Sequence, residues 1–87
     1  MARQFNVHEE WDHILVQCSY HSDFKYRVFF GTVNWEDTAD NLTPAYVVFI
    51  QHGDAIWYDR PAHIMLQDLD SVVGALQELR NRSRAGA

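Results

Sequence analysis

The chain has 87 residues, of which 47% are hydrophobic and 14% aromatic, and its formal net charge at pH 7 is −5. This length predicts a single domain over residues 1–87, because two domains would each be too short to bury a core, and the apolar content excludes a disordered chain. One cysteine, Cys18, excludes an intrachain disulfide, which small secreted domains usually need. With no signal-like or membrane-length apolar run, we expect a cytoplasmic protein.

The charges are distributed unevenly along the chain. Residues 1–79 hold all twelve acidic side chains and only four basic ones, a net charge of −8, and three arginines follow at positions 80, 82 and 84. An acidic body repels nucleic-acid phosphates and attracts basic protein surfaces, although the same acidity can serve solubility alone. We therefore expect a protein partner with a basic surface, and neither nucleic acid nor a membrane.

The N-terminal half predicts two strands after an edge segment. Residues 1–12 form either an edge strand or a flexible arm. Apolar side chains at every second position predict a strand over 13–20, and the polar residues 21–23 form a turn. A second strand over 25–35 is rich in aromatic and β-branched residues. Gly31 within it indicates a bulge or a close backbone approach.

The next segment predicts a loop followed by a hairpin. Residues 36–44 are polar and end in a proline, so we assign them to a loop. A nearly continuous apolar strand over 45–52 is then followed by Gly53 and Asp54, a pair typical of two-residue hairpin turns. The returning strand covers residues 55–59.

One helix is predicted, over residues 67–82, and residues 83–87 are expected to be a disordered tail. Gly74 in the middle costs about 1 kcal/mol relative to alanine, or permits close packing against the sheet. The predicted fold is α+β: an antiparallel sheet of four, or five, strands followed by one C-terminal helix on one face. The apolar stripe of the helix comprises Leu69, Val72, Val73, Leu76 and Leu79.

The predicted strands are apolar on both faces, whereas a sheet with one solvated face should alternate apolar and polar residues. A single helix covers only one face, so three alternatives remain for the other. The sheet or the N-terminal segment folds over it, a second copy covers it in a homodimer, or a foreign partner does. In the predicted hairpin, one face carries Tyr46, Val48, Ile50, Ala55 and Trp57, and the other Val47, Phe49, Ile56 and Tyr58.

Motifs for phosphate, dinucleotide, nucleophile-elbow, zinc-protease or paired-cysteine chemistry do not occur in the sequence. His8, His13, Cys18 and His21 are zinc ligands by residue type. On a strand, however, Cys18 and His21 point to opposite faces, which argues against a shared metal.

Three further groupings are candidates for acid–base or nucleophilic chemistry: Cys18 with a histidine, His52 with Asp54, and Asp59 with His63. A cysteine on an apolar strand face is more often a buried side chain, and polar residues at turns are more often turn formers. We therefore expect no enzymatic activity, catalytic residue, metal or cofactor. A small enzyme or a metal protein is kept as an alternative hypothesis.

Four strands followed by a helix, with His63-Ile64-Met65-Leu66 leading into that helix, resemble the positive-cofactor-4 family of transcription coactivators over residues 25–80. The resemblance implies a module for single-stranded nucleic acid, here using Lys25, Arg27, Arg60 and the arginine tail. That family binds through a lysine-rich strand surface. This chain has one lysine and an acidic sheet region, so the binding chemistry does not carry over.

In size and composition the chain is also similar to the small acidic inhibitors that phages encode, anti-CRISPR proteins among them, and to immunity proteins and antitoxins. This similarity implies a non-enzymatic protein-binding regulator or inhibitor, located in the host cytoplasm if a phage encodes it. If the long loop folds toward one end of the sheet, five turn and loop carboxylates cluster there: Asp23, Glu36, Asp37, Asp40 and Asp54. The expected partner-binding residues are Trp35, Glu36, Asp37, Asp40, Asp54, Trp57 and Tyr58.

Overall fold

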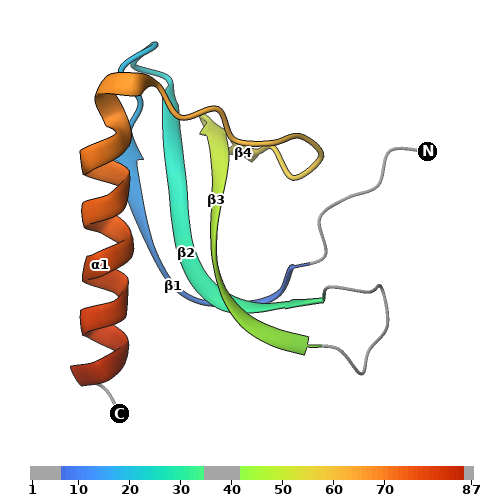
Figure 1. Ribbon diagram of the computed structural model, residues 1–87. Coiled ribbons are helices and arrows are strands. Elements are labelled where there is room, and N and C mark those ends of the chain that lie inside the picture. The colour runs from blue at the N-terminus through green and yellow to red at the C-terminus, as the bar shows by residue number, and fades with distance from the viewer. Residues whose placement is uncertain (1–6, 35–41, 86–87) are drawn as a thin grey trace.

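The computed structural model describes residues 7–34 and 42–85. One antiparallel sheet has the strand order β1-β2-β3-β4 and is followed by a short 3-10 helix, η1, and by α1 (Figure 1). The predicted α+β arrangement is therefore confirmed. No helix in these two described segments is long and apolar enough to cross a membrane. The elements are β1 Val7–Gln17, β2 Phe24–Asn34, β3 Leu42–His52, β4 Ala55–Ile56, η1 Leu66–Asp68 and α1 Leu69–Ala85.

β1 is one strand at the edge of the sheet, in place of the predicted edge segment and separate strand. It includes residues 7–12, whereas residues 1–6 lie outside the described part of the chain. β1 ends at Gln17, three residues earlier than predicted. The Cys18 amide donates to the Phe24 carbonyl (3.1 Å), which closes the turn into β2. Tyr20 therefore lies in the turn and is exposed instead of lying in the sheet.

Gly31 in β2 is required by the close approach of β1. The β1–β2 register shifts between Val7 and Glu9 and again between Glu10 and Asp12, on the stretch that faces this glycine. A Cβ atom at position 31 would overlap the Glu9 carbonyl oxygen. The close backbone approach expected at this glycine is confirmed, whereas the irregular pairing lies in β1 and not at Gly31 itself.

β3 begins at Leu42, three residues before the predicted start. Residues 42–44, which we assigned to the loop, are therefore strand, including Pro44. Within the described part of the chain, β4 pairs only with Gln51 and His52. Pro44 thus lies where β3 is an edge strand, a position that tolerates the missing amide hydrogen.

The predicted two-residue hairpin turn is confirmed, since His52 pairs with Ala55 and Gly53 has φ 59°. That φ lies in the left-handed region, which glycine adopts at least cost. The returning strand is much shorter than predicted, however. The Trp57 amide still donates to the Ile50 carbonyl (2.9 Å), but the Tyr58 amide donates to the Ile56 carbonyl (3.1 Å), and this turn ends the strand pairing.

α1 begins two residues later than the predicted helix and continues to Ala85, so part of the expected disordered tail is helical. α1 packs against β1 and β2. Gly74 is exposed, and a Cβ atom there would meet nothing within 4 Å. Close packing against the sheet is therefore not the reason for this glycine. The core between helix and sheet comprises Cys18, Tyr26, Val28, Ile50, Val72, Ala75 and Leu79.

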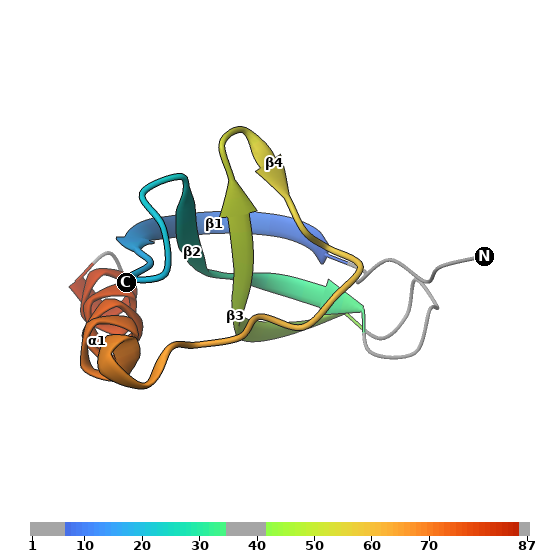
Figure 2. The ribbon, with the colours of Figure 1, turned by 90° about the horizontal axis from the view of Figure 1, so that it is seen from above.

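The sheet face away from α1 is also covered within the chain. Phe29 is 1% and Phe49 4% exposed, and their ring centroids are 5.7 Å apart. β2 and β3 bend strongly, so that the sheet curls away from α1 around this face (Figures 1 and 2). Tyr58 closes on Phe49 with a centroid distance of 5.0 Å. Among the described residues, the curl of the sheet and Tyr58 contribute to the burial of these two phenylalanines.

Replacing Gly31 and replacing Gly74 by alanine should have opposite effects on stability. Gly31→Ala should lower the free energy of unfolding by about 1–3 kcal/mol, because the new methyl group forces the β1 and β2 backbones apart. Gly74→Ala should raise it by about 1 kcal/mol, since an exposed helical site gains propensity without a clash. Urea denaturation of both variants measures the changes. Effects of the same sign would contradict the close approach at Gly31.

Candidate protein-binding surface

Two turns lie side by side at the end of the sheet where β2 begins and β3 ends. The Gly53 amide donates to the Asp23 carbonyl oxygen (3.2 Å), which joins the β3–β4 turn to the β1–β2 turn. Asp23 and Asp54 are both exposed at this end. Two members of the predicted acidic cluster are therefore brought together.

The other three acids of that cluster, Glu36, Asp37 and Asp40, lie outside the described residues, as does Trp35. The residues that flank this segment, Asn34 and Leu42, pair with each other at the opposite end of β2 and β3. Asp23 and Asp54 therefore lie at the other end of the sheet from the residues that flank this segment.

A pocket of about 380 Å³ opens beside the two turns, between the sheet and the segment that leads from β4 to α1. Its volume falls within the usual range for small-molecule and side-chain binding sites. Rings and aliphatic side chains form most of the wall, with one histidine. We call this site the aromatic pocket, and it is lined by Cys18, Tyr20, Phe24, Ile50, Trp57, His63 and Met65.

Phe24 holds the rings of the aromatic pocket in place. It stacks on His52, with centroids 4.5 Å apart and planes 16° from parallel. Tyr20 and Trp57 meet it edge-on at 5.7 and 5.4 Å. Such contacts add to the stability of each ring position, so the rings of the wall support one another without a partner. Tyr20 remains 70% exposed and offers its outer side to solvent.

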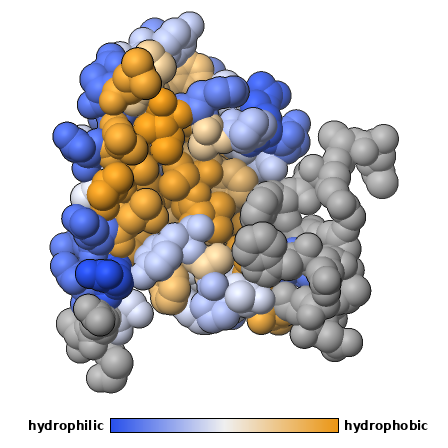
Figure 3. Space-filling model, viewed as in Figure 1, coloured by the Kyte–Doolittle hydropathy of each residue, from blue (hydrophilic) through white to orange (hydrophobic). Residues whose placement is uncertain are grey.

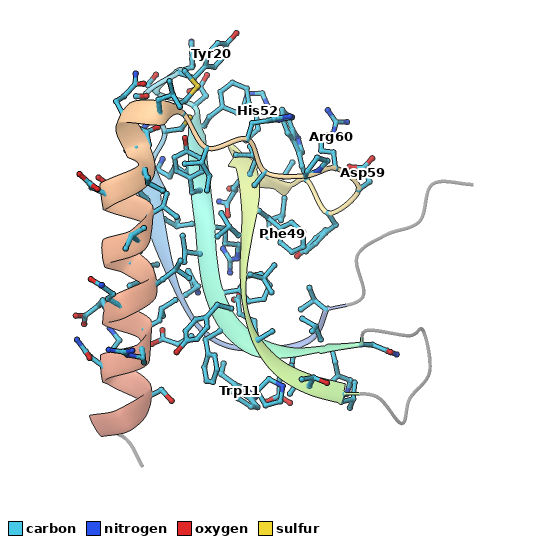
Figure 4. The ribbon with its side chains drawn as sticks, viewed as in Figure 1. Trp11, Tyr20, Phe49, His52, Asp59 and Arg60 are labelled. Carbon is cyan, nitrogen blue, oxygen red and sulfur yellow. The ribbon has the colours of Figure 1, made fainter. Side chains whose placement is uncertain are left out.

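A charged pair lies over the outer wall of the pocket. The Arg60 guanidinium is 4.6 Å from the Trp57 ring centroid, a cation–π contact, and Arg60 pairs with Asp59 at 3.5 Å. Figure 4 shows Tyr20, His52, Asp59 and Arg60 together at this end of the molecule. Asp59 and Arg60 thus form a local ion pair at this corner.

The predicted site residues divide between the two sheet faces. Trp57 lines the aromatic pocket near Asp54, whereas Tyr58 packs against Phe49 in the curl. Sequence reasoning missed Tyr20 and Phe24, because their role depends on the turn meeting residues about forty positions later. The only local feature of the sequence that could have indicated these two pocket residues is that each is an aromatic residue directly beside a polar turn.

Three of the arginines form ion pairs. Arg27 makes a two-pronged pair with Glu10 through its Nε and Nη2 atoms (2.8 and 2.7 Å), and these hydrogen bonds raise the pKa of Arg27. Arg82 pairs with Glu78 at 3.0 Å and with Asp12 at 3.4 Å. Together with the Arg60 pair, these contacts weigh against the nucleic-acid alternative, which needs cations available for phosphates.

Within residues 7–34 and 42–85, no three His, Cys, Asp or Glu side chains are grouped as metal ligands. Cys18 is buried, and its thiol donates to the Tyr26 hydroxyl (3.4 Å). The cysteine thus contacts a tyrosine instead of the histidine that would activate a nucleophile.

A buried carboxylate ties the aromatic pocket to the start of α1. Asp68 is 7% exposed and accepts hydrogen bonds from the Ser19 amide (2.9 Å), the Tyr26 hydroxyl (2.7 Å) and the Ser19 hydroxyl (3.0 Å). These bonds lower the pKa of the Asp68 carboxyl, the Ser19 amide contributing most. The Met65 amide donates to the Tyr26 hydroxyl (2.9 Å). The turn after β1, strand β2 and the segment before α1 therefore meet at one network.

Comparison with models of known protein families, with curated proteins and with solved structures finds no match. Any proposal about the function of this chain therefore rests on the chemistry and geometry of its own residues.

Removing the Tyr26 hydroxyl should break this network. We expect Tyr26→Phe to lower the free energy of unfolding by about 1–3 kcal/mol, since the Met65 amide loses its acceptor and Asp68 loses a donor. Tyr58→Phe is the matched control, with an expected change near zero, because that side chain is partly exposed and contacts Phe49 through its ring. Equal losses in urea denaturation would contradict the network.

The Asp68 carboxyl also predicts an acid-side pH dependence. Its pKa is lower in the folded than in the unfolded state, so its contribution to stability is present above about pH 4 and is lost as the pH falls below that value. The melting temperature of the wild type should therefore fall more steeply between about pH 6 and pH 3 than that of Asp68→Asn. Parallel curves would show that Asp68 has no such role.

Proposed function

We propose that this chain is a non-enzymatic protein-binding module, of regulator or inhibitor type, that takes an apolar side chain of its partner into the aromatic pocket. One observation carries the proposal. A pocket of about 380 Å³ with an ordered aromatic wall opens directly beside two exposed carboxylates. Aromatic anchors in well-packed pockets dominate the binding energy of many protein interfaces.

The charges around the pocket favour a basic partner segment. Within the described part of the chain, the Asp54 carboxylate has no ion pair and the Asp23 carboxylate pairs only with His21, at 3.7 Å. Carboxylates at the rim of an apolar contact speed association with lysine and arginine side chains and select against acidic partners. The fitting partner therefore presents a leucine, methionine or phenylalanine side chain flanked by basic residues.

Binding is favoured over catalysis by the polar groups of the pocket. Catalysis by the thiol needs a base within hydrogen-bond reach, and the Cys18 thiol is directed at Tyr26. The other residues of the lining with polar groups are Tyr20, Trp57 and His63. The rest of the wall is apolar, which suits a side chain that leaves water on binding.

Affinity capture with the tagged chain, followed by calorimetric titration of the captured protein, tests the proposal. We expect Asp23→Lys with Asp54→Lys to weaken binding by roughly tenfold or more, equivalent to about 1.4 kcal/mol, and Tyr20→Ala to do the same. The affinity should also fall as the salt concentration rises, because exposed charges contribute to it.

Glu9→Lys is the matched control, since it reverses an exposed acid on β1 away from the pocket, and it should leave the affinity unchanged. Binding that survives both the charge reversals and the Tyr20 truncation would overturn the proposed site. Tight binding of single-stranded DNA at low salt would favour the nucleic-acid alternative instead.

A further inference from the structure

α1 has a second apolar side that the sheet does not cover. Leu66 is 95%, Leu69 54% and Val73 39% exposed. Leu66 belongs to η1, and Leu69, Val73 and the half-buried Leu76 of α1 follow it at intervals of three, four and three residues. We call these four residues the helix stripe. The stripe lies roughly 100° around the helix from the side that α1 buries against the sheet. Figure 3 shows a continuous apolar surface along α1 and onto the neighbouring strands.

The sheet is wider than the single helix that packs on it. A helix with its side chains is about 10 Å across, close to the width of two strand spacings, and α1 packs against β1 and β2. On β3, Tyr46 is 43% exposed and Val48 half-buried, on the same sheet face as the core residues Tyr26 and Val28. Beside the helix stripe, the part of this face that carries Tyr46 and Val48 is therefore left partly uncovered.

The helix stripe has the residue spacing that packs against another helix. Alternation of three and four residues is the pattern of left-handed helix pairs, in which apolar side chains of one helix fill gaps in the other. After Leu76 the next position of this pattern is Arg80, which is exposed. The stripe thus has an apolar centre and a basic end, and Asp70 beside Leu69 makes the other end acidic.

We propose that the helix stripe binds the α1 of a second copy of this chain, antiparallel, in a two-fold dimer. With the two-fold axis beside Gly74, Val73 faces Leu76 of the second copy and Leu69 faces its Arg80. Each Asp70 then lies beside an Arg80 of the other copy. Neither residue has an ion pair within residues 7–34 and 42–85. A parallel pair would instead bring like charges together.

This dimer is independent of the proposed function. The helix stripe lies on α1, whereas the aromatic pocket lies at the turn end of the sheet, so the loss of either leaves the other intact. Because two-fold pairing uses the same patch on both copies, each dimer presents two aromatic pockets. This dimer also differs from the homodimer that the sequence predicts. In that homodimer an apolar sheet face makes the contact, whereas here a helix makes it.

Sedimentation over a range of concentrations tests the dimer. We expect the wild type to reach twice the chain mass of 10.2 kDa. Leu69→Asp with Val73→Asp should sediment at the mass of one chain. The matched control, Gln67→Asp with Ser71→Asp, adds the same charge to the far side of the helix and should stay dimeric. Circular dichroism checks that each variant is folded.

Charge exchange tests the antiparallel arrangement. Asp70→Arg alone and Arg80→Asp alone should each weaken the dimer, because they oppose like charges, and the two together should restore it. A wild type that stays at the mass of one chain overturns the proposal. So does a Leu69, Val73 double variant that stays dimeric, and failure of the combined exchange to restore association overturns the antiparallel pairing.

Discussion

The carboxylate of Asp68 joins parts of this molecule that are more than forty residues apart in the sequence. It accepts hydrogen bonds from the turn after β1 and from the Tyr26 hydroxyl of β2, while Tyr26 in turn accepts from the segment that leads into α1. A buried carboxylate is stable only when such donors satisfy it. The start of α1 and the floor of the aromatic pocket are therefore set by one polar contact within an apolar core.

The two apolar faces of the sheet are buried in different ways. On one face α1 packs Val72, Ala75 and Leu79 against β1 and β2. On the other, the sheet curls around Phe29 and Phe49, with Tyr58 closing on them. Strong curvature needs places where strands deviate from regular pairing, and the register shifts of β1 opposite Gly31 supply two. The curl removes these phenylalanines from the surfaces available for binding.

Two surfaces are left with unused apolar area, and they differ in chemistry. The aromatic pocket combines ordered rings with the carboxylates of Asp23 and Asp54, a combination that suits a basic partner with an apolar anchor. The helix stripe combines aliphatic side chains with one acidic and one basic end, which makes it complementary to itself. A module that pairs through a helix and presents its pocket at another end would bring two pockets to one partner or to two.

Periodicity and turn chemistry in the sequence alone determined the strands, the Gly53-Asp54 hairpin, the helix and the need for Gly31, because each depends on neighbours within a few residues. The sequence also indicated that both sheet faces are apolar. Only the tertiary structure decided how the second face is buried, since curvature arises from the pairing of whole strands. The same holds for Asp68, which in the sequence is simply an acidic residue near the start of the helix. It also holds for Tyr20 and Phe24, because their pocket forms only where distant segments meet.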